Sequence, residues 1–370
     1  MMRHRPIVYT GSLKFSPIFK SHSCAFGKVC KEFGLNVRYM FSLNYNWMLD
    51  EQTRQETLFI GSTKGILSML LDFFNPLNYI RVLAAFRRFP PSCVYLHNYH
   101  LLNHFIAKLC KLLNASFIYH VHEPYIRSKQ AHGKLSSLVL SVYEALQEIL
   151  LRNTNVAIVS SREAYKLFKE RYRNFRGKLV LIPLMYEDMG KKFLNHTVGE
   201  RKWITFIGPP VLAKGPEKFL EIVEYCEKHI PQLKFLLITR KKLRDPRFFK
   251  FKNMKIFYKE RITDDEIYYL ISRSIAVITP YKRETQSSVV LTAYMCGTPV
   301  LSSNVGGLPE FIKDGETGFL LSYDSPPDKW VERLVRICKN LDFFSKNARS
   351  SFVKYFSEVN WRKFLRKVLV

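Results

Sequence analysis

The sequence predicts an α/β protein built on two doubly wound parallel sheets, and three observations support this fold class. Short, almost continuously apolar runs alternate with stretches of helical periodicity, which is typical of parallel strands covered by helices on both faces. The chain has 370 residues, more than one hydrophobic core usually holds, so two domains are expected. The weakly periodic stretch 185–202 separates two series of these runs.

Each apolar run is an expected strand. The first series is 6–10, 93–97, 117–122, 156–160 and 179–183, and the second is 203–208, 234–239, 255–258, 275–279, 299–303 and 318–321. Helices are expected between the runs, because Ser160 with Glu163, and Thr263 with Glu266, have the spacing of a capping box. The predicted parts are therefore an N-terminal domain (1–185), a C-terminal domain (186–350) and a final helix (351–370).

Positive charge is the strongest compositional signal. The formal net charge is +27, and both halves share it, with 25 basic and 12 acidic residues in 1–190 and 33 and 19 in 191–370. Such a surface attracts nucleic acid, anionic lipid head groups or phosphate-bearing substrates. Basic and aromatic residues are interleaved at 240–262 and at 78–89, a mixture that suits nucleic acid and membranes alike. Charge is the sole support for nucleic-acid binding, because the sequence has no zinc finger or RNP-like motif.

The seven cysteines are scattered, with no CxxC motif or paired spacing. This pattern predicts a reduced, cytoplasmic protein without a metal site. Neither the start, MMRHRPIVYTG, nor any later segment has the apolar length of a secretory signal or of a spanning helix.

The stretch WITFIGPPVLAKGPEKFLE contains the first candidate site. Its strand ends at Gly208, and a helix opens after Lys214. In open parallel sheets, ligands bind beyond the carboxyl ends of the strands. A cation and unpaired N–H groups would meet there, which suits a phosphate. Spacing alone supports equally well a surface lysine that merely lies beside a helix start.

The second candidate site lies between Thr279 and Leu321. Glu284 follows the expected strand 275–279, and a helix is expected to begin at Ser287 and Ser288. Hydroxyls and amides at a helix start bind oxygen-rich ligands, and a loop carboxylate can accept hydrogen bonds from sugar hydroxyls or stabilise a developing positive charge. On spacing alone, the expected role of Glu284 is that of a solvated residue paired with Lys282 or Arg283.

These residues resemble a family motif. Glu284, the seven residues TQSSVVL and the following GTPVLSSNVGGLPEFIKDGETGFLL (297–321) are similar to the retaining family 4 glycosyltransferases of the GT-B fold, also called glycosyl transferases group 1. That family has Glu, seven residues, Glu, then a Gly-Thr/x-Pro-Val strand and a Gly-Gly-x-Pro-Glu turn. FIYHVHEP (117–124) and VAIVSSREAYKLF (156–168) resemble segments of its N-terminal domain. The resemblance covers most of the chain and is strongest from about 200 to 321.

The resemblance implies two Rossmann-like domains facing across a cleft, with the final helix crossing back to the N-terminal domain and Trp361 packing in the crossover. It implies a hexosyltransferase that takes a hexose from a UDP- or GDP-linked sugar, with retention and without a metal or other cofactor. The implied acceptor is a saccharide or a lipid-linked molecule. The expected location is cytoplasmic and peripheral, on the anionic cytosolic face of a membrane, with no specific nucleic-acid partner.

The resemblance also implies roles for individual residues. His122 and Glu284 are the expected catalytic residues at the reacting centre, where Glu284 contacts the transferred sugar. Lys214 is expected to neutralise the diphosphate. His120 is expected to be a packed residue. The other implied donor-binding residues are Gly208, Ser287, Ser288, Val289 and Thr292.

Three departures from the family pattern weaken the expected donor affinity, and one of them is the loop SLKFSPIF (12–19), which lacks the family's Gly-Gly dipeptide. Thr292 replaces the second glutamate, which in the family holds the ribose hydroxyls, and Pro209 stands where the family has the arginine partner of Lys214. Two alternatives therefore stay open. One is a degenerate, catalytically weak member of the family that binds or scaffolds a partner, and the other is a polyanion-binding protein that uses its basic surface.

Overall fold

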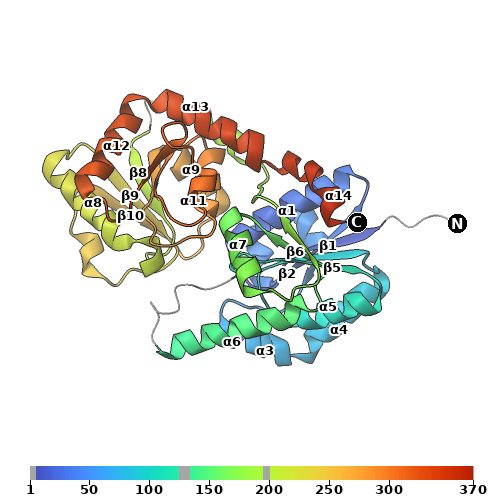
Figure 1. Cartoon of the computed structure of the whole chain (residues 1–370). Coiled ribbons are helices and arrows are strands. Elements are labelled where there is room, and N and C mark those ends of the chain that lie inside the picture. Colours follow the sequence, from blue (N-terminus) through green and yellow to red (C-terminus); the bar gives the residue numbers. More distant parts are fainter. Residues whose placement is uncertain (1–5, 125–133, 195–200, 370) are drawn as a thin grey trace. The chain divides into compact units, whose positions relative to one another are not determined.

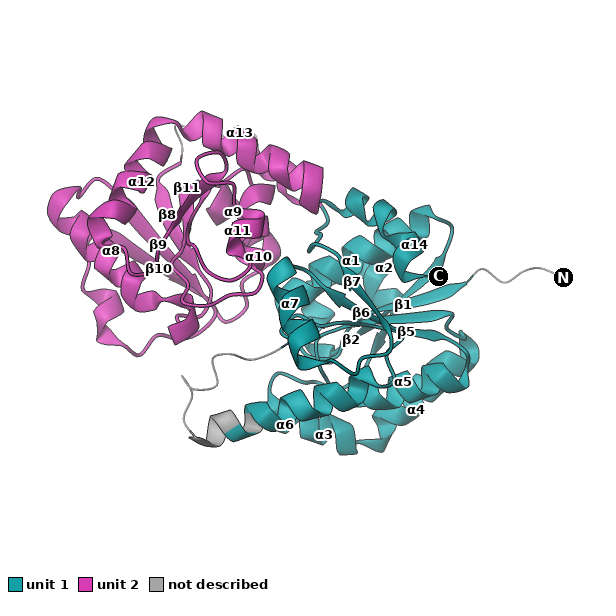
Figure 2. Ribbon diagram, in the orientation of Figure 1, with its two compact units in different colours: residues 1–187, 357–370 teal, residues 188–356 magenta. Residues whose placement is uncertain are grey.

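A computed structural model describes residues 6–124, 134–194 and 201–369 of the chain. The chain divides into two compact units, coloured separately in Figure 2: unit 1 comprises residues 1–187 and 357–370, and unit 2 comprises 188–356. The first division falls after residue 187 where the sequence suggested 185, and the second falls after 356 where it suggested 350.

Unit 1 is built on a seven-stranded parallel sheet of order β3-β2-β1-β4-β5-β6-β7 (Figure 1). Two of its strands match no expected run, because Asn36 and Arg38 interrupt the apolar pattern of β2 and because β3 has only three residues. The strands are β1 (Ile7–Ser12), β2 (Asn36–Phe41), β3 (Thr57–Phe59), β4 (Cys93–His97), β5 (Ser116–His120), β6 (Val156–Val159) and β7 (Lys178–Leu181).

Helices cover both faces of this sheet. Along each strand, alternate side chains enter opposite cores. Tyr9 of β1 packs with the core on the side of α4 and α5, whereas Val8 packs with the core on the side of α1. The helices of unit 1 are α1 (Pro17–Glu32), α2 (Glu51–Gln55), α3 (Ile66–Phe74), α4 (Pro76–Arg88), α5 (Leu102–Leu112), α6 (Lys134–Leu151) and α7 (Arg162–Arg171), together with a 3₁₀ helix at Leu43–Met48.

The C-terminal segment 357–370 also belongs to unit 1. The single final helix expected over 351–370 is wrong: a π-helical turn (Phe352–Phe356) is followed by a 3₁₀ helix (Glu358–Lys363) and the short helix α14 (Leu365–Val368). The Trp361 side chain is buried, and its ring lies edge-on to Phe26 with the centroids 5.0 Å apart. The segment is therefore anchored beside α1 by aromatic packing.

Unit 2 is built on a six-stranded parallel sheet of order β10-β9-β8-β11-β12-β13. Each strand overlaps one expected run: β8 (Trp203–Ile207), β9 (Lys234–Thr239), β10 (Met254–Tyr258), β11 (Ser274–Thr279), β12 (Val300–Ser303) and β13 (Gly318–Leu321). The helices are α8 (Pro216–His229), α9 (Asp264–Ser272), α10 (Ser288–Met295), α11 (Leu308–Phe311), α12 (Pro327–Lys339) and α13 (Leu341–Ser351). Short 3₁₀ helices lie at Gly190–Phe193, Leu212–Lys214 and Pro246–Phe249.

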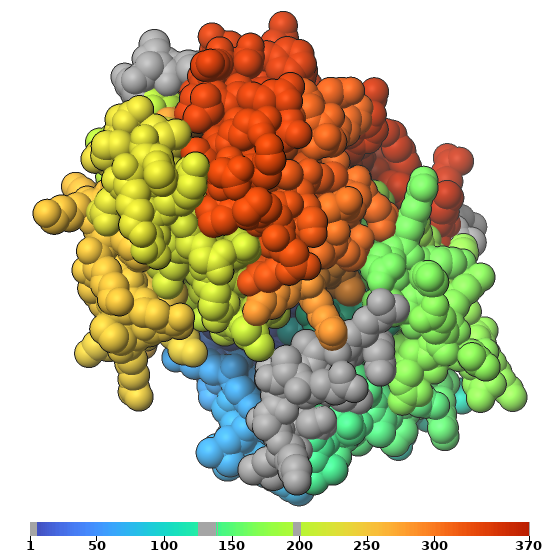
Figure 3. Space-filling model, turned by 60° about the vertical axis from the view of Figure 1, so that its left-hand side comes forward, coloured from blue at the N-terminus to red at the C-terminus, as the bar shows by residue number. Residues whose placement is uncertain are grey.

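One core of unit 2 lies between α8, α12 and the sheet. Phe219 of α8 and Trp330 of α12 are fully buried there. In the space-filling view of Figure 3, the two helices form adjoining yellow and red-orange surfaces. This packing fixes α8, and with it the loop that precedes α8 at the edge of the sheet.

The strand order reverses once in each sheet. The reversal lies between β1 and β4 in unit 1, and between β8 and β11 in unit 2. At such a switch point the loops leave neighbouring strands in opposite directions and open a crevice at the carboxyl ends of the strands. Segments distant in the sequence therefore meet at these two places.

Within the three described ranges, no helix combines the length and the apolar character needed to cross a bilayer.

Candidate functional site

The switch point of unit 2 brings Lys214 and Glu284 together. Lys214 ends the 3₁₀ turn after β8, and Glu284 lies in the loop after β11. The Lys214 ammonium forms an ion pair with the Glu284 carboxylate and lies 3.9 Å from the centroid of the Tyr281 ring. The two side chains are 26% and 12% exposed. The pair is therefore largely shielded from water but open to a ligand.

Backbone contacts hold these two loops against each other. The Lys282 N–H donates to the Ala213 carbonyl at 2.9 Å. Gly215, which precedes α8, has a φ of +61° and lies so close to β11 that a Cβ would stand 1.8 Å from the Pro280 carbonyl oxygen. Only glycine combines this φ with so close an approach. Gly215 thus fixes the position of Lys214 relative to the end of β11.

The Gly-Gly turn after β12 fixes the backbone of Glu284. The Gly307 N–H donates to the Glu284 carbonyl at 3.1 Å. Gly306 has a φ of +53°, and a Cβ there would stand 1.8 Å from the same carbonyl oxygen. The Gly-Gly part of the predicted motif therefore acts mainly by supporting the loop that carries the glutamate.

Helix α10 begins beside this loop. Ser287 occupies the N-cap position, but its buried hydroxyl makes no capping hydrogen bond. Ser288 and Val289 lie in the first turn, where backbone N–H groups have no acceptor within the helix, and both are partly exposed. Amides at a positive helix end stabilise phosphate or sugar oxygens. The three residues thus lie where the sequence placed them, at a helix start beside Glu284.

Thr292 lies one turn further along α10. Its hydroxyl donates to the Ser288 carbonyl at 3.0 Å. Because the Thr292 hydroxyl donates its only proton within its own helix, it can only accept hydrogen bonds from a ligand. Thr292 is therefore a poor replacement for a carboxylate that accepts two hydrogen bonds.

Gly208 leads into the open side of this site. Its φ is +117°, and the space in which a Cβ would stand has no other atom within 4 Å. A hollow of about 430 Å³ opens at the ends of β12 and β13, lined by Lys282, Tyr323 and four neighbouring residues. The Lys282 ammonium lies 5.3 Å from the centroid of the Tyr323 ring.

Sequence reasoning missed Lys282 and Tyr323 as candidate functional residues. It considered Lys282 only as an ion-pair partner of Glu284, whereas in the structure the Glu284 carboxylate forms its ion pair with Lys214. Lys282 instead points its charge at Tyr323, 41 residues further on. The available signal was the position of Lys282 in the loop that follows the expected strand 275–279.

The switch point of unit 1 holds a cluster of histidines. His97 ends β4, His120 ends β5, His122 follows two residues later, and His22 lies on α1. The His120 and His122 rings stack with centroids 4.1 Å apart, and His97 Nδ1 lies 3.3 Å from His122 Nε2. The sequence indicated only His122 as a site residue, and the structure adds its contact with His97.

Burial keeps these imidazoles uncharged. It lowers the pKa of His22 to about 3. Burial, reinforced by neighbouring imidazoles, also lowers the pKa of His97, His120 and His122 well below the ordinary value. His122 is the partly exposed member of the cluster, whereas the other three are buried. His122 therefore presents a neutral imidazole, able to donate one hydrogen bond and accept another.

His120 is a packed residue, as expected. Its two ring nitrogens lie 2.7 Å from the Tyr95 hydroxyl and 2.7 Å from the Ser160 hydroxyl. This contact also corrects the expected capping box at Ser160. The cap of α7 is Ser161, whose hydroxyl accepts from the Ala164 N–H at 3.0 Å.

Three of these histidines are close enough to be considered as metal ligands. His97, His120 and His122 each place one nitrogen within 4.8 Å of the others. However, both His120 nitrogens are engaged in hydrogen bonds, and the rings of His120 and His122 are 12° from parallel. Stacked rings direct their lone pairs along parallel planes. The arrangement therefore suits a hydrogen-bonded cluster better than convergent metal ligation.

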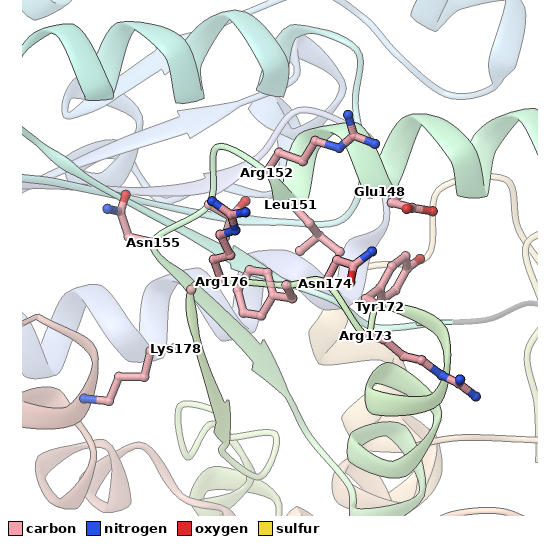
Figure 4. Close-up of a pocket in the computed structure, with 12 residues that line it drawn as sticks. Glu148, Leu151, Arg152, Asn155, Tyr172, Arg173, Asn174, Arg176 and Lys178 are labelled. Carbon is pink, nitrogen blue, oxygen red and sulfur yellow. The ribbon is translucent and has the colours of Figure 1, made fainter.

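A larger pocket of about 1020 Å³ lies elsewhere in unit 1 (Figure 4). It opens at the amino ends of β6 and β7, and the basic residues that line it are Arg152, Arg173, Arg176 and Lys178. No predicted site residue lines it. In a parallel sheet, this edge is opposite to the one that carries the histidines, so the pocket is separate from the candidate site.

Comparison with known proteins finds a family model that matches part of the chain. Residues 201–340 match the family model described as glycosyl transferases group 1. A D-inositol 3-phosphate glycosyltransferase from Paenarthrobacter aurescens is 27% identical over 139 residues, which are 35% of this chain and 34% of that relative. The match therefore spans about a third of the length of this curated relative.

Solved structures match over nearly the whole chain. Sucrose-phosphate synthase from Thermosynechococcus elongatus has a TM-score of 0.72 at 16% identity and covers 98% of this chain and 99% of its own. HepE from Anabaena in complex with UDP-glucose has a TM-score of 0.70 at 15% identity, with 99% of both chains covered.

The chain thus has the GT-B fold, with two Rossmann-like α/β units, as predicted. Residues 201–340 match the model of the glycosyl transferases group 1, which agrees with the resemblance found in the motif.

Proposed function

We propose that the protein is a retaining, metal-independent glycosyltransferase that moves a hexose from a UDP- or GDP-linked sugar to a saccharide or lipid-linked acceptor. The observation that carries the proposal is the Lys214–Glu284 pair, which lies at the β8/β11 switch point beside the start of α10. A cation, a helix N-terminus and a carboxylate in one place suit a ligand with a diphosphate at one end and hydroxyls at the other. The UDP-glucose complex of HepE supports a nucleotide-sugar donor.

In this proposal the donor separates Lys214 from Glu284, and each side chain then binds a different part of the donor. Without a ligand, Lys214 and Glu284 neutralise each other inside a partly shielded loop. An arriving diphosphate takes the ammonium of Lys214 and the amides around Ser287–Val289. The Glu284 carboxylate is then released to accept hydrogen bonds from the sugar. Charge that develops on the leaving diphosphate is stabilised by a cation and helix amides that are already oriented.

Lys282 is the proposed second cation. Pro209 cannot supply the positive charge that the family has at its position, but Lys282 lines the adjoining hollow. Its backbone is tied to Ala213, next to Lys214. Two ammonium groups would then share the diphosphate, which reduces the consequence of the departure at Pro209.

His122 is the proposed unit 1 contribution to the reacting centre. Its neutral imidazole can hydrogen-bond a hydroxyl of the transferred sugar, and His97 lies close enough to orient the ring. No covalent nucleophile is assigned, because retention in this family is described as same-face attack through an oxocarbenium-like state.

A catalytically weak binding protein is the second candidate. The engaged hydroxyl of Thr292 favours it, because ribose binding would lack a carboxylate. Product formation separates the two functions: a transferase forms a glycoside and loses this activity in Glu284→Gln, whereas a binding protein shows a donor-induced shift without turnover.

Donor binding is tested by thermal unfolding with UDP, GDP, ADP and their sugar conjugates. A ligand present at about 100 times its dissociation constant stabilises the folded chain by about 2.7 kcal/mol. We expect a nucleotide-specific shift that Lys214→Ala removes. The matched control is Lys228→Ala, which removes a lysine of the same unit whose side chain is 65% exposed. The absence of any shift at millimolar nucleotide would contradict the proposal.

The proposed location is the cytosolic face of a membrane, where the enzyme is peripheral. The net charge of +27 supports an anionic surface as a partner.

A further inference from the structure

Helix α3 turns its apolar side chains away from the protein. Ile66, Leu67, Leu70, Leu71 and Phe74 are between 41% and 77% exposed on a helix of nine residues. Scattered exposed leucines are ordinary in soluble proteins, but a contiguous group of large apolar side chains marks an interaction surface.

Helix α4 extends this surface. Leu77, Ile80 and Leu83 are 47–58% exposed. Only Asn75 separates the two helices, and they contact each other along the outside of unit 1 (Figure 1). We call the eight exposed residues of the two helices the α3–α4 face.

The buried side of α3 carries a polar anchor, Asp72, beside the apolar core residue Met69. Asp72 is buried, and its carboxylate accepts from the Ser62 N–H at 3.0 and 2.9 Å and from the Thr63 hydroxyl. Thr63 in turn lies 2.8 Å from His100 Nε2. The helix thus has the reverse of the usual arrangement, because its acidic residue points inward and its leucines point outward.

A second buried polar side chain fixes α4 in the same way. The Asn78 side-chain amide donates to the Asp72 carbonyl at 2.8 Å, and its Oδ1 accepts from the Gly61 N–H at 3.1 Å. Turning either helix to bury its leucines would leave buried polar groups without partners, which is costly. The outward orientation of the α3–α4 face is therefore enforced by its anchoring.

Positive charge borders this face. Lys64 precedes α3, and Arg81, Arg87 and Arg88 are exposed on α4. Asp72 is the one acidic residue between 64 and 88, and it is buried. An apolar surface whose own two helices expose only cationic charge is complementary to acyl chains below a layer of anionic head groups.

We propose that the α3–α4 face docks the protein on a lipid bilayer that contains anionic lipids, with the leucines entering the acyl boundary and the arginines contacting head groups. The inference deepens the proposed function, since it specifies how unit 1 would reach a lipid-linked acceptor. A second copy of the chain is a less suitable occupant, because two chains of net charge +27 would bring their cationic borders together.

The test is cosedimentation of the full chain with phosphatidylcholine vesicles, with and without phosphatidylglycerol, in the absence of any nucleotide. We expect binding to the anionic vesicles. Leu67→Ser combined with Leu71→Ser should weaken it roughly tenfold or more, because two large apolar side chains no longer leave water. The control is Leu112→Ser, at an 80% exposed leucine of α5, which should bind as the wild type does. Arg87→Gln with Arg88→Gln should reduce the preference for anionic vesicles.

Three outcomes overturn the inference. Wild type that binds no vesicles, or a double leucine variant that binds as well as the control, removes the α3–α4 face as a membrane surface. A wild-type dimer that the leucine variant converts to a monomer in light scattering assigns the face to a second copy instead. Nucleotide-induced thermal shifts, measured on the same proteins, report the donor site separately. A failed docking surface is therefore distinguishable from a failed transferase.

Discussion

The support that Gly306 gives to Glu284 yields the sharpest prediction. In Gly306→Ala, the new Cβ would stand 1.8 Å from the Glu284 carbonyl oxygen, whereas carbon–oxygen contacts are normally about 3.3 Å or longer. The Glu284 loop must therefore move by about 1.5 Å, or the turn must open. A misplacement of about 1 Å at a reacting centre can lower the rate about a hundredfold, which is about 2.7 kcal/mol of transition-state stabilisation.

Gly315→Ala is the matched control. Gly315 also has a positive φ, +75°, but nothing lies within 4 Å of the position that a Cβ would take. Both variants bear the cost of a left-handed alanine, about 1–2 kcal/mol, and only Gly306→Ala also displaces the glutamate. Sugar transfer or donor hydrolysis is compared at equal folded fraction. If Gly306→Ala retained activity within about threefold of Gly315→Ala, the argument that the Gly-Gly turn positions Glu284 would be refuted.

Three further predictions concern both units. Burial holds the pKa of His22 and of His100 at about 3. Below pH ~6.5 the unfolded chain therefore binds protons that the folded chain does not, and the free energy of unfolding should fall by about 1.4 kcal/mol per pH unit for each histidine. An unchanged urea midpoint between pH 7.5 and 5.5 would contradict this. Trp361→Ala should destabilise unit 1 by about 3–5 kcal/mol in urea unfolding, and a loss below about 1 kcal/mol would show that the C-terminal segment is dispensable. Thr292→Glu should tighten nucleotide binding about tenfold in titration calorimetry, because a carboxylate accepts charged hydrogen bonds worth about 1.5–3 kcal/mol, and unchanged affinity would place the ribose elsewhere.

Local patterns predicted much of the fold. The strands of unit 2 were predicted because each is a buried apolar run between turns, and the capping box of Thr263 and Glu266 forms with both of its hydrogen bonds, at 3.2 and 2.8 Å. The strand β2 was not predicted, because the polar residues Asn36 and Arg38 interrupt its apolar pattern. The cap of α7 was misplaced by one residue because two adjacent serines compete for the position, and only the contact of Ser160 with His120 decides between them.

The candidate site was predicted in part. The motif selected Lys214, Glu284 and the residues at the start of α10, since each follows a strand or opens a helix. Which charges meet could not be predicted, because 70 residues separate the two members of the ion pair. The hydroxyl of Thr292 could likewise be assigned to its own helix only from the geometry.

The α/β class, the family resemblance of residues 201–340 and the turn that carries Glu284 could be predicted from the sequence, because these depend on neighbouring residues in the chain. The order of the strands, the histidine cluster around His122 and the outward orientation of α3 could be established only from the folded chain. The physical reason is that these features rest on contacts between distant segments. The helical pattern of α3 places leucines on one side and Asp72 on the other, but the buried partners Ser62 and Thr63 determine which side faces water.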